Sequence, residues 1–143
     1  MKTYFDHEKL DVYREAIAFC CWSGELLATI TARAAVKDQL DRASTIPLNI
    51  AEGNGKFSQR DRARFLEIAR SAAFECAACL DVMVVRGLVA EEDIAIRKEQ
   101  LSRIVQMLMG MLRKFSGHAE FLHEDEGSYS IPVEHEHDGE EKE

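Results

Sequence analysis

The chain has 143 residues, of which 46% are hydrophobic, and a net charge of −8. This size predicts a single domain with a sizeable core, and without an apolar run near the ~20 residues of a membrane span, or a signal peptide, we expect a cytoplasmic protein with no membrane partner. The four cysteines, adjacent at 20 and 21 and close together at 76 and 79, favour reduced thiols over disulfides.

The charge is unevenly distributed along the chain. Residues 118–143 contain ten acidic residues against Lys142 alone, a charge of −9, which leaves +1 on residues 1–117. The sequence therefore divides into a near-neutral body at 1–117 and an acidic tail at 118–143. The tail has no helical period, so we expect it to be mostly disordered, with local docking open to its few large apolar side chains, Phe121, Leu122, Tyr129 and Ile131.

The first helical pattern covers about residues 6–31. Asp6 is a good N-cap, and Phe5 and Leu10 have the spacing of a hydrophobic staple. One row of apolar or small side chains follows steps of three and four, and a second row widens it, so this helix needs neighbours on more than one side. The first row is Leu10, Tyr13, Ile17, Cys20, Gly24, Leu27 and Thr31, and the second is Val12, Ala16, Phe19, Leu26 and Ile30.

The second pattern, at about residues 36–52, keeps one apolar arc across Pro47. A proline inside a helix removes the hydrogen bond to the carbonyl of Ala43 and should kink the helix, at a cost of about 3 kcal/mol unless packing compensates. Gly53 follows the helix, at the position where a positive φ is expected.

Ser58, with Asp61 three residues later, predicts the start of a long third helix at about residues 59–86. Gly87 ends it. Its many alanines would let another helix approach closely.

The fourth helix is expected to begin at Glu91 in an acidic first turn and to end at Lys114, with Gly117 beyond. Four helices with short connections predict an all-α fold, an antiparallel up-down four-helix bundle with a kinked second helix. Apolar side chains outside the inward row of the fourth helix suggest a second buried face in an oligomer; they are Val105, Met107, Met109 and Leu112.

The segment around the predicted kink carries a family resemblance. Seventeen positions, including the proline within a helix, resemble the four helix bundle family named for the open reading frame in bacterial 23S rRNA intervening sequences. They are Gln39, Arg42, Ala43, Ile46, Pro47, Asn49, Ile50, Ala51, Glu52, Gly53, Ser58, Arg64, Phe65, Leu66, Ala69 and Ser71, with Glu75 further on.

This resemblance covers roughly residues 5–115 and leaves the tail outside it. Such proteins are similar to the accessory variability determinant of diversity-generating retroelements, also a small four-helix bundle. The resemblance implies a homopentameric ring of bundles and no known enzymatic activity. It implies nucleic acid or a reverse transcriptase as partner only in the retroelement branch.

A row of polar side chains lies beside the apolar arc of the second helix, within about 140° at 100° per residue. Half-buried polar groups must be paired, so we predict contacts to the third helix in a structural polar network. The alternative is a ligand or interface site. The row is Gln39, Arg42, Asn49 and Glu52, and its expected complements on the third helix are Glu75 and Arg70.

The basic side chains of the body concentrate at the start of the third helix, in Lys56, Arg60, Arg62, Arg64 and Arg70. With the turn at 53–58 they could bind nucleic acid or another anion at a helix N-terminus. The turn is not a P-loop, because a helix precedes it and Phe57 follows the lysine. A body at +1 beside a tail at −9 is a weak nucleic-acid binder, and we hypothesise that the tail competes for this patch.

We predict no metal, cofactor or catalytic residues. Cys76 and Cys79 could bind zinc with Cys20 or Cys21, but a helix is an unusual place for a zinc pair, so we interpret them as small buried hydrophobes. The tail residues His135, Glu136, His137 and Asp138 could bind a metal weakly, but we interpret them as a solvated acidic run. No nucleophile, base and orienting group can be assembled, so we do not expect an enzyme.

The sequence therefore favours a non-catalytic, homo-oligomeric four-helix bundle, pentameric through the resemblance, that acts as a scaffold or adaptor. The alternative is an RNA- or DNA-binding accessory protein that partners a nucleic-acid enzyme such as a reverse transcriptase.

Overall fold

The structure, a computed structural model, describes residues 2–30, 38 and 40–116. Within these residues the fold is all-α, with four α-helices, two short 3-10 helices and no strand. The α-helices are α1 (Asp11–Thr29), α3 (Thr45–Asn54), α4 (Gln59–Val85) and α5 (Glu91–Ser116), and the 3-10 helices are η1 (Asp6–Lys9) and η2 (Asp41–Ser44).

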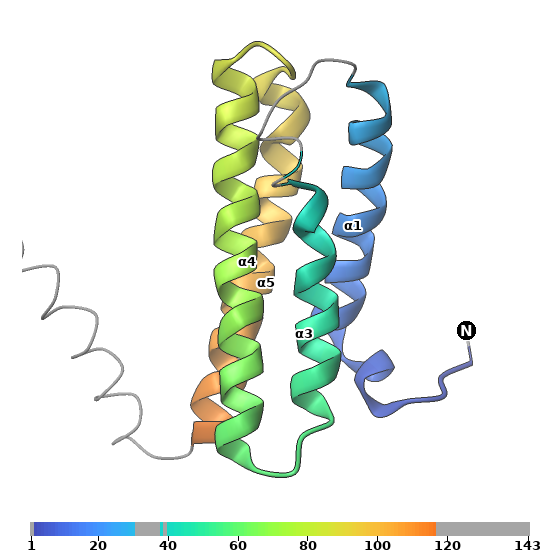
Figure 1. Ribbon diagram of the computed structural model, residues 1–143, viewed down its shortest axis with the longest axis vertical. Coiled ribbons are helices and arrows are strands. Elements are labelled where there is room, and N and C mark those ends of the chain that lie inside the picture. The colour runs from blue at the N-terminus through green and yellow to red at the C-terminus, as the bar shows by residue number, and fades with distance from the viewer. Residues whose placement is uncertain (1, 31–37, 39, 117–143) are drawn as a thin grey trace, which may run out of the picture.

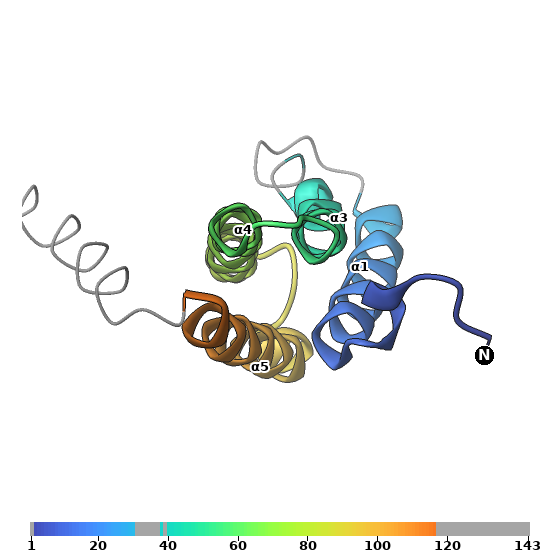
Figure 2. The same ribbon diagram turned by 90° about the horizontal axis from the view of Figure 1, so that it is seen from below.

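The four helices lie side by side around a common core (Figures 1 and 2). Seen end-on, α3 packs between α1 and α4, and α5 closes the arrangement by packing against both α4 and α1 (Figure 2). A short turn joins α3 to α4 at one end, and another joins α4 to α5 at the other end (Figure 1). The helix α4 contacts two helices along its length, and its buried side chains are mostly small.

The core contains large side chains from each of the helices. Its largest fully buried members are Phe19, Leu40, Ile46, Ile50, Leu66, Leu80, Met83, Leu101, Ile104 and Leu108. No helix in the described part of the chain has the length and hydropathy needed to cross a membrane.

The first helix begins later than its N-cap pattern predicts. Residues 6–9 form η1, and Leu10 is extended (φ −78°, ψ 130°) before α1 starts at Asp11. The reason is local: the carboxylate of Glu8 accepts the N–H groups of Tyr4 (3.2 Å) and Phe5 (3.1 Å), which closes a separate turn. The prediction that Asp6 caps this α-helix is wrong.

The face that α1 buries also differs from the first predicted row. Val12, Ala16 and Phe19 are buried, whereas Ile17 is 44% exposed and Gly24 lies at the surface. The second predicted row therefore forms the centre of the buried face. Thr31 lies outside the described residues.

Pro47 is the third residue of α3 and not part of the middle of a helix, because η2 precedes α3. The N–H groups of a first helical turn have no acceptor within their own helix, so a proline there costs little. The predicted start of this helix at residue 36 lies outside the described residues. Its end extends two residues beyond the prediction, to Asn54.

Gly53 has a different role from the one predicted. It is a helical residue of α3, and Gly87 (φ 75°) is the only residue with positive φ in the described part of the chain. A Cβ on Gly53 would lie 3.1 Å from the carbonyl oxygen of Arg62 and 3.1 Å from the Cβ of Phe65. The close approach of α3 to α4 therefore favours glycine at this position.

The ends of the two long helices agree with the local signals. The Ser58 hydroxyl accepts the N–H of Asp61 (3.0 Å) at the start of α4, and Gly87 follows its end with the expected positive φ. The helix α5 begins at Glu91, as predicted, and ends at Ser116.

Candidate functional site

The polar row predicted on the second helix makes local contacts. The Asn49 amide donates to the carbonyl of Thr45 (2.8 Å), and Glu52 pairs with Lys56 (3.2 Å) in the turn that follows. Arg42 is exposed, and Gln39 lies outside the described residues.

The two expected partners on α4 do not meet this row. Arg70 pairs with Glu67 one turn earlier (3.0 Å), and Glu75 is exposed. Among the described residues, no hydrogen bond or ion pair joins the predicted row to these two side chains. The cross-helix network predicted at this place stays a prediction.

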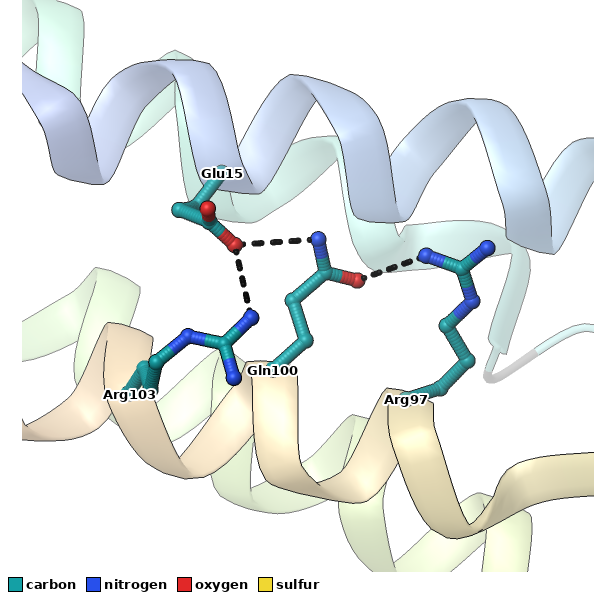
Figure 3. A network of polar contacts seen from close by, with 4 residues as sticks. All are labelled: Glu15, Arg97, Gln100 and Arg103. Carbon is teal, nitrogen blue, oxygen red and sulfur yellow. Dashed lines mark hydrogen bonds and ion pairs between the residues drawn. The ribbon is translucent and has the colours of Figure 1, made fainter.

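A polar network between helices does exist, but it joins α1 to α5 (Figure 3). The Gln100 amide donates to Glu15 Oε1 (3.1 Å) and accepts from Arg97 (3.2 Å). Arg103 pairs with the same Glu15 oxygen (3.4 Å), and Arg97 stacks over the Trp22 ring at 5.2 Å. Both ends of the amide are therefore satisfied.

Gln100 is only 5% exposed, so these bonds replace those it would make to water. The sequence analysis missed this network. The available signal was a glutamine directly beside the inward-facing Leu101, where an apolar side chain is the usual choice.

Aromatic rings hold most of the predicted basic side chains in place. Lys56 and Arg64 both lie over the Phe65 ring, at 5.0 and 5.4 Å. Arg64 also pairs with Asp61 at 3.8 Å, and Arg70 lies over the Phe74 ring at 5.5 Å. These contacts leave the cations at the surface and limit their freedom.

Arg62 and Arg60 differ sharply in their surroundings. Arg62 donates to the carbonyl of Lys56 (2.7 Å) and stacks over Phe115 at 5.2 Å, which ties the turn after α3 to the last turn of α5. Arg60 is exposed and has no ion pair or hydrogen bond with another described residue. It is therefore the most available cation of the predicted patch.

An open groove of about 480 Å³ lies beside Arg60, between the first half of α4 and the last turns of α5. It combines two arginines, two carboxylates and a short apolar floor. The lining residues are Arg60, Asp61, Ala63, Arg64, Glu67, Ile68, Ser71 and Leu112. We name this feature the α4–α5 groove.

The model of the 23S rRNA-intervening sequence protein family matches residues 8–110. The chain belongs to this family. The resemblance predicted from the residues around Pro47 is thereby confirmed. A solved structure described as a protein with unknown function from the S23 ribosomal protein family of Bacteroides thetaiotaomicron VPI-5482 is similar, with a TM-score of 0.67 and 19% identity over 71% of this chain and 98% of that chain. At that identity the likeness shows the fold alone. No curated protein matches the chain.

Three of the four cysteines, all except the exposed Cys21, are poor candidates for reactive groups. Burial raises the pKa of Cys76 to about 12 and that of Cys20 to about 11, and burial followed by the charge of Glu75 raises the pKa of Cys79. These thiols stay protonated near neutral pH, whereas metal binding and nucleophilic attack need the thiolate. In the described part of the chain, no group of three or more metal-binding side chains occurs.

Proposed function

We propose that this protein is a non-catalytic, homo-oligomeric scaffold or adaptor that works in the cytoplasm, with five copies as the number implied by the family resemblance. Within each copy we propose an antiparallel up-down order of helices and a kink where η2 meets α3. The observation that carries the proposal is an apolar row on the outer face of α4, which no other part of the described chain covers.

Four large apolar side chains of this row are exposed: Ile68 (43%), Phe74 (53%), Val82 (39%) and Val85 (85%). At 3.6 residues per turn they share about 120° of the helix surface, together with the small Ser71 and Ala78 and the exposed carboxylate of Glu75. Small side chains between large ones allow another helix to approach. A contiguous exposed apolar patch usually marks a protein contact, and its burial between copies would remove it from water.

Light scattering on purified full-length protein tests this proposal. Val82→Glu with Val85→Glu should reduce the mass, because a charge buried in an apolar contact without a partner is strongly unfavourable. The matched control is Ile96→Glu, an exposed apolar residue of α5 that we place outside the contact. Circular dichroism checks that both variants fold. A wild-type protein with the mass of one chain would refute the proposal.

Nucleic-acid binding is the second candidate, and Arg60 is the observation that favours it. This unpaired arginine lies next to Lys56 and Arg64, and the neighbouring Phe57 is fully exposed, so cations and an aromatic ring occur together. Cations bind phosphates, and aromatic rings stack on unpaired bases. A nucleic-acid enzyme such as a reverse transcriptase would then be the protein partner.

Filter binding with a structured RNA across a salt series tests this candidate. Affinity should fall as salt rises, and Arg60→Glu should weaken binding at every salt concentration. Arg86→Glu is the control, since it makes the same charge change at the other end of α4. Equal binding by both variants would refute a role for this surface.

A further inference from the structure

The α4–α5 groove lies at the end of the bundle from which the chain continues into the acidic tail. The helix α5 ends at Ser116, beside the start of α4 (Figure 1), and Leu112, one turn earlier, lines the groove. An extended chain covers roughly 3.3–3.6 Å per residue, so five or six residues beyond Ser116 can reach any point of the groove floor. Segments at 118–126 are therefore within reach of the groove.

The charges at this end of the bundle complement those of the tail. Within the groove the two carboxylates are already paired, Asp61 with Arg64 and Glu67 with Arg70, which leaves Arg60 without a partner among the described residues. Residues 118–143 carry −9, and the run 124–126 is entirely acidic. The short distance and the opposite charges favour association of the tail with the groove.

The apolar parts also match. Ile68 is 43% exposed, and with Leu112 it provides an apolar floor between the charged rims. In the tail, Phe121 and Leu122 come shortly before the acidic run and are separated from it by His123. Burying two such side chains removes apolar surface from water, which can offset the ordering of a short segment.

We propose that the acidic tail of the same chain docks in the α4–α5 groove, with Phe121 and Leu122 over Ile68 and Leu112 and the acidic run at 124–126 against Arg60. In this position the tail covers the basic surface and acts as an internal competitor for any anionic ligand. The proposal needs neither an oligomer nor a nucleic acid. It shares the Ile68 end of the apolar row on α4, and the rest of that row stays available for a contact between copies.

Nuclear magnetic resonance on the intact, ¹⁵N-labelled chain tests the docking directly. Signals from 118–126 should be broadened and shifted in the wild type at low salt. Arg60→Glu should sharpen them and return them to the positions typical of an unstructured chain. The same release is expected at high salt, where exposed charges are screened. Phe121→Ser with Leu122→Ser should also release the tail, and this variant leaves the bundle unchanged.

Arg86→Glu is the matched control, because Arg86 is also an exposed arginine without an ion pair to a described residue, but it directly follows the far end of α4. It should leave the tail signals as in the wild type. Sharp, unshifted tail signals in the wild type would overturn the proposal. So would equal effects of Arg60→Glu and Arg86→Glu, or broadening that disappears on dilution, which would make a second copy the occupant.

Discussion

Three glycines lie inside helices, and a methyl group would meet different surroundings at each. At Gly53 it would press on the backbone of α4, whereas at Gly24 and Gly110 it would meet no atom within 4 Å. A helical sequence pattern alone treats all three as the same unfavourable residue. Only the packing of α3 on α4 distinguishes Gly53 from the other two glycines.

We predict that Gly53→Ala destabilises the protein by about 1 kcal/mol, because overpacking of about 1–3 kcal/mol exceeds the gain of about 1 kcal/mol in helix propensity. Gly24→Ala should instead stabilise by about 0.5–1 kcal/mol. Urea unfolding followed by circular dichroism measures both. Stabilisation by both substitutions would contradict the close approach at Gly53.

Because three thiols are shielded from water, we predict that the free energy of unfolding decreases at basic pH. The pKa of Cys76 is about 12 in the folded chain against an ordinary 9.0, so the folded state keeps a proton that the unfolded state releases. This contribution is fully present below pH 9 and is lost as pH rises from 9 towards 12, by about 1.4 kcal/mol per pH unit for one thiol. Cys76→Ala should reduce the slope of stability against pH in that window. An unchanged slope would contradict the role of burial.

At the scale of elements, local signals were sufficient for α4 and α5 and insufficient for α1 and α3. Ser58, Gly87 and Glu91 act through bonds and charges within one turn, so their positions mark helix ends. The start of α1 depended on whether Asp6 or Glu8 closes the first turn, a choice that the capping pattern does not decide. The close packing at Gly53 depends on a neighbouring helix.

The candidate site divides in the same way. The basic residues at the start of α4 were predicted from composition. The structure adds that neighbouring aromatic rings and carboxylates contact the other basic side chains and leave Arg60 available. The α1–α5 network was not predicted, because Glu15 and Gln100 are far apart in the sequence and the pattern does not show which polar residues meet.

We predict that Gln100→Ala destabilises the protein by about 1–3 kcal/mol, because it removes a buried amide that links Glu15 and Arg97. Gln106→Ala is the control. Gln106 is exposed and bonds only to Ser102 of its own helix (3.4 Å), so its loss should cost less than about 0.5 kcal/mol. Thermal and urea unfolding compare the two. Equal costs would show that the network does not help to hold α1 against α5.

At the scale of the whole molecule, the apolar row on α4 and the polar contacts within each helix both suggest a bundle that is complete in itself and exposes one apolar face. The bundle closes its own core, with side chains such as Phe19, Leu66 and Leu108, and leaves one helix face apolar and uncovered. Large side chains on that face stay exposed within one copy, although Phe74 also lies against the Arg70 guanidinium. We therefore propose that copies meet over Phe74, Val82 and Val85, and that the α4–α5 groove, which includes Ile68 at the other end of the row, binds the tail.

The most direct test is the mass of the full-length protein in solution by light scattering. The account predicts a mass several-fold above the 16.2 kDa of one chain, five-fold for the proposed pentamer, and a lower mass for Val82→Glu with Val85→Glu. A wild-type mass of 16.2 kDa across the accessible concentration range would contradict it.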